Sequence, residues 1–329
     1  MASAIEMGAV IRKRSLGAFR GREMGTLGGL LILCIGLWIA TPHFVTVSNL
    51  VNVVQQSTII GVIAVGMTFV IITGGIDLSV GSIVALAGIT FGTLAQANVP
   101  LPLAAAGALL AGTLCGAVNG TLITIGRLPP FIATLGLMSV ARGIALMLSD
   151  GRPISGFPAG FRTLATGTVA GIPLPVIIML ALYGAAYFVL TRVRLGRYTY
   201  AIGGNEEATA LSGVNVRAYK TIVYCISGFV SALTSLLLVA RLNSAQPIAG
   251  ISYELDAIAA VVIGGTSLLG GSGSVVGTLI GTLIMSVLRN GLNLLGVSSY
   301  LQQVAIGTVI VVAVLVDMAL RRRASLPTG

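Results

Sequence analysis

Residues 24–76 read MGTLGGLLILCIGLWIATPHFVTVSNLVNVVQQSTIIGVIAVGMTFVIITGGI and contain no Asp, Glu, Lys or Arg. A helix of about 20 predominantly apolar residues crosses the ~30 Å hydrocarbon core of a bilayer. This one stretch is therefore long enough for two membrane-spanning helices. A soluble helical core would need polar helix faces at the helical period, and the stretch lacks them.

Stretches without these four residue types recur along the chain, over residues 78–126, 163–191, 221–240, 257–288 and 290–316. Of the 329 residues, 9% are charged and 56% hydrophobic, and the mean hydropathy is +1.02. Roughly a quarter of the residues of a soluble domain are charged, so these charges are too few to cover a soluble surface. We therefore expect an all-α integral membrane protein in contact with membrane lipid.

We expect about ten transmembrane helices, near residues 24–41, 55–73, 80–97, 101–125, 131–148, 174–191, 220–240, 254–268, 274–290 and 301–319. They form a transmembrane domain over residues 24–320, between a basic tail at residues 1–23 and a second tail at residues 321–329. The first apolar run is long for a signal peptide and no A-x-A pattern follows it. We interpret it as an uncleaved first span.

The Lys and Arg residues predict the orientation. With a cytoplasmic N-terminus, fourteen of the 19 basic residues fall on inner segments and five at outer or membrane-edge positions. Basic residues accumulate on the cytoplasmic side, so we expect both termini and a long loop at residues 192–220 in the cytoplasm. A Pro- and Gly-rich segment at residues 150–173 then lies outside.

Glycine spacing predicts close packing of helices. Glycines recur every four residues at positions 112, 116 and 120, and at 273, 277 and 281, which lets helix backbones approach closely. We favour packing within one bundle over a subunit interface. Residues 74–84 (GGIDLSVGSIV) also echo residues 264–276 (GGTSLLGGSGSVV), which suggests an internal duplication; chance similarity is the alternative in a chain with 44 glycines.

The inner loop contains a short predicted helix within residues 196–214, GRYTYAIGGNEEATALSGV. An Asn side chain can cap a helix N-terminus, acidic residues are favourable in its first turn, and glycine suits the turn that ends it. The residues concerned are Gly204, Asn205, Glu206, Glu207, Ala208 and Gly213. Because a cap, an acidic first turn and a terminating glycine all define this short helix, we interpret it as a docking helix rather than an ordinary surface helix.

Residues absent from the chain exclude several chemistries. His43 is the sole histidine, and the three cysteines at positions 34, 115 and 225 are far apart in apolar segments, so no metal site or disulfide is expected. Neither lysine follows a glycine, so the chain has no P-loop for ATP. We expect no cofactor in this chain, and no enzymatic activity, because HExxH and GxSxG are missing. The net charge of +10 reflects basic residues at span ends, and no nucleic acid is expected as a partner.

Polar residues within apolar segments are candidates for a solute pathway, because polar groups in hydrocarbon are costly unless they face a cavity or a partner. The candidates are Gln55, Gln56, Ser57, Asn119, Asn290 and Asn293. Hydrogen bonds between helices are an equally good explanation of each. Asp77 and Ser79 together are expected to cap the helix that follows them, with a gating or ATPase-contact role as the alternative for Asp77. Glu254 and Asp256 enter the eighth span near its N-terminus, where acidic residues are favoured.

Three segments resemble a known family: residues 64–81 (AVGMTFVIITGGIDLSVG), 196–214, and 253–302, which includes ELDAIAAVV and NGLNLLGVSSY. They are similar to the permease subunits of bacterial ribose-type ABC importers, within the binding-protein-dependent branched-chain amino acid and monosaccharide permeases. The resemblance covers about residues 44–317. Glu207-Ala208-Thr209 followed by Gly213 also fits the EAA-xxx-G pattern of these permeases, with Thr in place of the second Ala, which marks the helix that enters a cleft of the ATPase.

The resemblance implies a homodimer with ten spans per subunit in the bacterial inner membrane. It implies two cytoplasmic ATPase subunits that bind ATP and Mg²⁺, and a periplasmic binding protein that delivers a sugar, with ribose or a related pentose expected. Arg152 and Arg162 of the outer segment are candidates for contacting that binding protein, with a solvated loop as the alternative.

A secondary transporter driven by ions is the alternative function. Its candidate acids, Asp77 and Asp256, map to span ends, which makes a buried ion relay a poor explanation of them.

Overall fold

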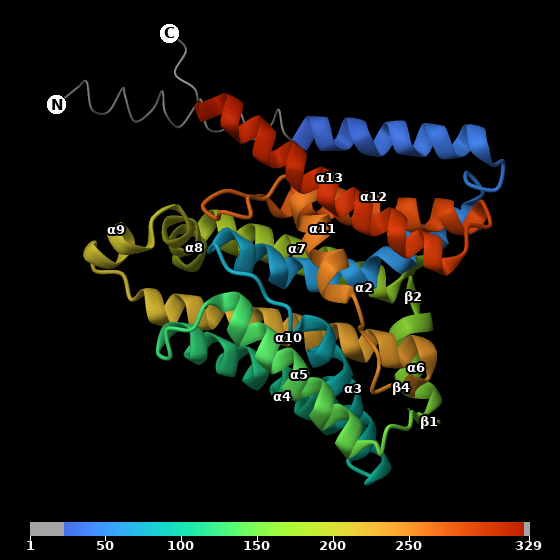
Figure 1. Ribbon diagram of the computed structural model, residues 1–329. Coiled ribbons are helices and arrows are strands. Elements are labelled where there is room, and N and C mark those ends of the chain that lie inside the picture. Colours follow the sequence, from blue (N-terminus) through green and yellow to red (C-terminus); the bar gives the residue numbers. More distant parts are fainter. Residues whose placement is uncertain (1–22, 326–329) are drawn as a thin grey trace.

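The computed structural model describes residues 23–325 and is predominantly helical (Figure 1). Seven of the described helices are long and apolar enough to cross a membrane. They are Glu23–Ala40, α2 (Val47–Ile72), α4 (Leu101–Thr124), α5 (Pro130–Leu148), α7 (Leu174–Arg192), α10 (Val216–Leu242) and α12 (Val275–Leu294). Three further apolar helices, α3 (Val80–Gln96), α11 (Tyr253–Ile263) and α13 (Ser299–Ser325), occupy the remaining predicted positions.

Several boundaries differ from the prediction. Helix α2 begins at Val47 rather than near residue 55, because Thr46 caps it by accepting a hydrogen bond from the Asn49 N–H. Helix α11 has 11 residues and ends at Ile263, too short to cross a bilayer alone. Helix α13 continues to Ser325, so the expected tail at residues 321–329 is helical in part. The basic residues of the expected tail at residues 1–23 lie outside the described residues.

The elements that do not span the bundle gather at its two opposite ends (Figure 1). Helices α8 (Arg194–Gly204) and α9 (Glu206–Leu211) lie at one end, which we call the α9 end. At the other, the α6 end, lie α6 (Ala159–Thr166) and four short strands. Strand β1 (Ile154–Ser155) pairs antiparallel with β4 (Ser244–Ala245), and β2 (Thr168–Val169) with β3 (Ile172–Pro173). The predicted inner loop and outer segment therefore occupy opposite ends.

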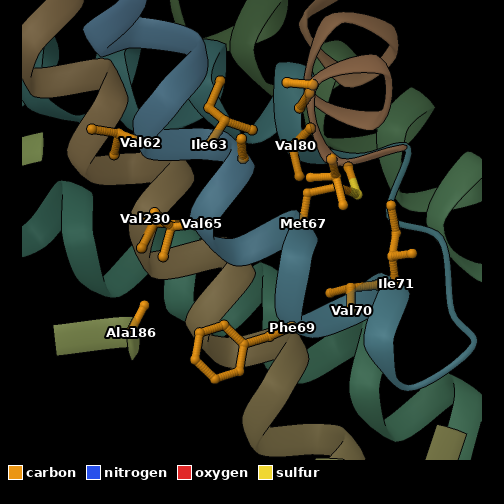
Figure 2. Close-up of a cluster of buried hydrophobic side chains, with 14 of the residues drawn as sticks. Val62, Ile63, Val65, Met67, Phe69, Val70, Ile71, Val80, Ala186 and Val230 are labelled. Atoms are coloured by element: carbon orange, nitrogen blue, oxygen red, sulfur yellow. The ribbon is translucent and has the colours of Figure 1, made fainter. Parts of the chain in front are cut away.

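Helix α2 forms the centre of the fold. It is apolar all round, as expected of a helix with neighbours on every side, and it packs against α7, α10, α11 and α12. Its buried side chains include Ile63, Met67 and Phe69 and pack with those of neighbouring helices, such as Ala186 of α7 and Val230 of α10 (Figure 2). The helix thus connects the α6 end, where it begins, to the α9 end.

The glycines at four-residue spacing pack within the bundle, as predicted. On α4, a Cβ atom at Gly116 would overlap the Tyr224 carbonyl oxygen of α10, and one at Gly112 would lie 2.6 Å from the Gly228 carbonyl oxygen. On α12, a Cβ atom at Gly281 would overlap the Ala260 carbonyl oxygen of α11. Small residues thus allow both helix pairs to pack backbone against backbone.

Two buried helices share a pattern in which a non-helical segment leads into a shorter helix. Helix α2 is followed by residues 73–79 and α3, and α10 by residues 243–252 and α11. The two patterns meet where α3 begins, because a Cβ atom at Gly81 would overlap the Gly250 carbonyl oxygen. This pairing involves different segments from the glycine turns that suggested a duplication, and the duplication stays a prediction.

We expect Gly116→Ala to destabilise the protein by about 1–3 kcal/mol, the usual range for overpacking, because the new Cβ atom meets backbone that cannot move aside. Thermal unfolding in detergent measures the effect. The matched control is Gly136→Ala on α5, where a Cβ atom meets nothing within 4 Å and better helix propensity should add up to about 1 kcal/mol. Equal unfolding temperatures for the two variants would contradict this account of α4.

Candidate functional site

Helix α9 has the capped geometry expected from the sequence. The Asn205 side-chain oxygen accepts a hydrogen bond from the Ala208 N–H at 2.8 Å, and Gly213 has a φ of +82° in the turn after the helix. An ion pair of 2.9 Å between Glu206 and Lys220 connects α9 to the first part of α10. The helix is thus a defined projection at the α9 end, as the local sequence indicates.

Sequence reasoning missed the apolar tip of this projection. Leu211, the last residue of α9, is 84% exposed, and Leu269 in the loop before α12 is 81% exposed. Both lie in or beside turns outside the long apolar helices. Residues of α9 and the first part of α10, including Glu207 and Arg217, also line a cavity of about 770 Å³. Leu211 and these charged residues therefore make the projection accessible to another protein.

A junction of glycines connects the projection to the centre of the bundle. A Cβ atom at Gly203, near the end of α8, would overlap the Ile72 carbonyl oxygen at the end of α2. The Gly271 N–H donates to that same oxygen at 2.9 Å. We call residues 72–75, 203–204 and 270–271 the glycine junction. Gly204, which was predicted as part of the coupling helix, is the last residue of α8 and contributes to this junction.

Tyr200 fixes α8 from a second direction. Its hydroxyl donates to the Gly273 carbonyl oxygen at 2.8 Å, in the loop that precedes α12. Burial, together with the negative charge of Glu23, raises the pKa of Tyr200 to about 12, so the hydroxyl stays protonated and keeps donating. The Ser274 hydroxyl in turn donates to Glu23 at 2.6 Å. The start of the first described helix therefore lies at the α9 end.

Asp77 is fully buried between α2 and α3 and holds the N-terminus of α3 to α10. One carboxyl oxygen accepts from the Ser79 N–H at 3.0 Å and the Ser79 hydroxyl at 2.6 Å; the other accepts from the Ser227 hydroxyl at 2.7 Å. The Asn119 amide of α4 donates to the Ser79 hydroxyl at 2.8 Å. Three of the predicted residues, Asp77, Ser79 and Asn119, thus belong to one hydrogen-bond network, but Ser79 makes no side-chain hydrogen bond to the first turn of α3, so its expected share in the cap is wrong.

Three other pathway candidates also have hydrogen bonds within the protein. Asn290 of α12 exchanges two hydrogen bonds with Asn49 of α2, at 3.0 and 2.8 Å. Asn293 accepts from the Gln302 amide at 2.8 Å, which closes the turn between α12 and α13, and the buried Ser57 hydroxyl donates to the Val54 carbonyl oxygen. The bonds of Asn290 and Asn293 join two helices, as in the alternative to a pathway role, whereas the Ser57 bond lies within α2; contact with a solute stays a prediction.

Gln55 and Gln56, like Asn293, line cavities, but unlike Asn293 they have no side-chain hydrogen bond among the described residues. Gln56 of α2 lines a cavity of about 330 Å³, which we call the α6-end cavity; its walls come from α2, α10, α11 and α12. Gln55 lines a neighbouring cavity of about 340 Å³ that includes Thr166 of α6. Arg241, at the end of α10, lines both cavities. The two glutamines are therefore the candidates best placed to meet a solute.

An ion pair that sequence reasoning did not predict lies in the wall of the α6-end cavity. The Arg289 Nη2 atom donates to both carboxyl oxygens of Asp256, at 2.9 and 2.7 Å. Arg142, assigned from sequence to the membrane edge, donates at 2.7 Å to the carbonyl oxygens of Pro247 and Ala249. It thereby fixes the non-helical segment before α11. Spacing along the chain gives no signal for either contact, because the partners are far apart in sequence.

The two arginines predicted to contact a binding protein are exposed. Arg152 precedes β1 and Arg162 lies on α6, so both belong to the α6 end. In the part of the chain that the structure describes, no group of three or more His, Cys, Asp or Glu side chains could hold a metal ion. The candidate site thus consists of a projection at one end and polar cavities near the other.

Comparison with known proteins supports a transport function for this arrangement. The family described as branched-chain amino acid transport system / permease component matches residues 49–314. The chain is 50% identical to the ribose import permease protein of Haemophilus influenzae over 90% of this chain and 93% of that protein. It is 49% identical to the ribose import permease protein of Bacillus subtilis, over 90% and 92%. The D-allose transport system permease protein of Escherichia coli is 40% identical, over 87% and 88%. No solved structure is significantly similar to the chain.

We expect Asp77→Ala to destabilise the protein by about 1–3 kcal/mol or more, because it leaves buried Ser79 and Ser227 donors without their acceptor. Asp77→Asn, which keeps one acceptor oxygen, should cost less. Thermal unfolding measures both, with Asp150→Asn in an exposed turn as the control for the lost charge. A normal unfolding temperature for Asp77→Ala combined with lost transport would contradict the capping role and favour the gating role.

Proposed function

This chain belongs to the branched-chain amino acid transport system / permease component family, and on that premise we propose that it forms the transmembrane pathway of an ABC importer for ribose. The observation that carries the proposal is its identity of about one half to ribose import permeases from different bacteria, over 90% of the chain. The allose and xylose relatives are less similar, at 40% and 35% identity. The expected location is the bacterial inner membrane.

We propose ten crossings per subunit, with both termini in the cytoplasm. Seven helices are long enough by themselves, and α3, α11 and α13 supply the others. Residues 243–252 complete the crossing of α11, which rises only about 17 Å. Non-helical backbone is tolerated at membrane depth where protein surrounds it, and Gly81 and Arg142 provide such surroundings. The hydrogen bond from Ser274 to Glu23 supports placing the N-terminus on the side of α9.

We propose that α9 is the coupling helix, docked on a separate ATPase subunit that binds ATP and Mg²⁺. The support is the capped projection, its exposed Leu211 and the glycine junction behind it. Two segments whose backbones are in direct contact move together, because no compressible side chain separates them. A push on α8 and α9 would therefore move the end of α2 and the loop before α12 as a unit, which suits largely rigid-body gating.

We propose that lipid and a second copy of the permease contact the sides of the bundle, and that the sugar-binding protein contacts its α6 end. Many large apolar side chains are exposed on Glu23–Ala40, α4, α5, α7 and α13, which suits contact with lipid and with a second copy of the permease. Arg152 and Arg162 are placed to meet a periplasmic sugar-binding protein. Sugar released there would enter beside Gln55 and Gln56.

We expect Leu211→Asp to lower recovery of the ATPase subunit with the permease by about tenfold or more, because a buried apolar anchor contributes much of the affinity of an interface. Co-purification of the two subunits from membranes measures this. The matched control is Leu295→Asp, an exposed leucine in the turn between α12 and α13. If the ATPase subunit is recovered equally with both variants, α9 does not dock on it.

A second variant tests transmission rather than docking. Replacing Glu207 and Gly213 together by Ala should leave the chain inserted in the membrane but reduce the sugar imported per ATP hydrolysed, because the φ of +82° at position 213 disfavours a residue with a Cβ atom. Uptake and phosphate release by the reconstituted importer give this ratio. An unchanged ratio would contradict the coupling role.

A further inference from the structure

We propose that the α6-end cavity is a transient binding site for the imported sugar, with Arg241, Arg289 and Gln56 as the residues that contact it. The inference rests on the proposed function and adds to it the place where the permease itself holds its substrate. It is carried by four features of the cavity: its position, its polar groups, its apolar wall and its size.

The position suits a solute that has just entered. Gln56 lies about 13 Å along α2 from the α6 end, at 1.5 Å per residue, and Arg241 lies in the last turn of α10 at that end. The neighbouring cavity shares Arg241 and reaches Thr166 of α6. Cavities therefore continue from the elements outside the bundle inward to Gln56.

The polar groups match a polyhydroxylated ligand. Each sugar hydroxyl both donates and accepts, so a site for a sugar needs both kinds of partner. Arg241 and Arg289 offer only donors, whereas Gln56 offers both donors and an acceptor. The pair of Arg289 and Asp256 uses a single guanidinium nitrogen, and the other donors of this guanidinium are not used in the pair. A charged pair that fixes its own geometry is preorganised for a ligand.

The charges also indicate that the cavity holds water. A guanidinium group in hydrocarbon is expensive unless it faces a partner or an aqueous cavity. The Arg289 side chain is 44% exposed although its partner Asp256 is only 6% exposed. Arg289 thus covers the buried carboxylate and presents its own surface outward.

The remaining wall and the volume fit a small sugar held weakly. Ile59, Leu238 and Met285, with the Tyr253 ring, provide apolar surface for the C–H groups of the sugar. A volume of about 330 Å³ lies at the lower limit of small-molecule sites, roughly 300–1,000 Å³. Such a site suits a small sugar such as a pentose. Weak binding is what a pathway requires, since tight binding would block release.

The first test uses the importer reconstituted with its ATPase and binding protein. Arg241→Gln and Arg289→Gln should each lower the sugar imported per ATP by about tenfold, while hydrolysis stimulated by the loaded binding protein persists. The matched control is Arg192→Gln, at the exposed end of α7, which should keep the normal ratio. A wild-type importer that carries no ribose overturns the proposed function; one that carries ribose with a normal ratio in both cavity variants overturns only the site.

A charge swap separates sugar contact from a structural role. Asp256→Arg combined with Arg289→Asp restores an ion pair but exchanges the donors and acceptors that face the cavity. We expect thermal stability close to that of the wild type and sugar import that stays low. Recovery of import together with stability would show that the pair is only structural and would overturn the assignment.

A third measurement detects occupancy without turnover. In a chain whose three cysteines are replaced by Ala, Gln56→Cys should react with a membrane-impermeant thiol reagent added outside. Excess ribose should slow the reaction, whereas a disaccharide at equal concentration should not. Equal rates with and without ribose would contradict binding at this cavity even if the importer is active.

Discussion

Backbone polar groups inside a membrane must find partners within the protein, and this requirement explains the arrangement of the bundle. Helices satisfy it alone, but the segments at residues 73–79 and 243–252 do not. The structure provides hydrogen-bond partners for both segments, although Ile248 and Ile251 of the second segment are exposed. The Ser79 hydroxyl and N–H bond to Asp77, the Thr134 hydroxyl donates to the Ile76 carbonyl oxygen, and Arg142 donates to two carbonyl oxygens of the second segment. Irregular backbone can thus persist within the bundle.

Features encoded within a few residues could be predicted from the sequence. The cap of α9 needs only Asn205 and the N–H three residues later, and the long apolar helices need only their own composition. Contacts between distant residues could not be predicted in this way. The hydrogen bonds of Asn290 with Asn49 and of Arg289 with Asp256 depend on how the helices pack against one another. The predicted span at residues 254–268 was too long, because the helix ends at Ile263 and is followed by Gly264 and by Gly265, which has a φ of +91°.

The same need for hydrogen-bond partners applies to polar side chains inside the bundle. An amide or carboxyl group in hydrocarbon is stable when it forms a hydrogen bond with a second polar group. Most polar candidates, such as Asp77, Asn119 and Asn290, form such bonds within the protein. Gln55 and Gln56 stand apart because, within the described residues, they line cavities without a side-chain hydrogen bond. Sequence reasoning treats all of these residues alike, since each is a polar residue in an apolar run. Only the packing of the bundle distinguishes groups that join helices from groups that line a cavity.

Helix α2 connects these two kinds of region. Its last residue, Ile72, accepts the Gly271 hydrogen bond in the glycine junction, and its Gln56 side chain lines the α6-end cavity. A helix buried on all sides has little freedom to bend, since its neighbours are close-packed. A displacement at the α9 end is therefore expected to reach the cavity wall as a shift of the whole helix rather than dissipate along it. Work done on a small projection can in this way change the volume available to a solute at the opposite end of the bundle.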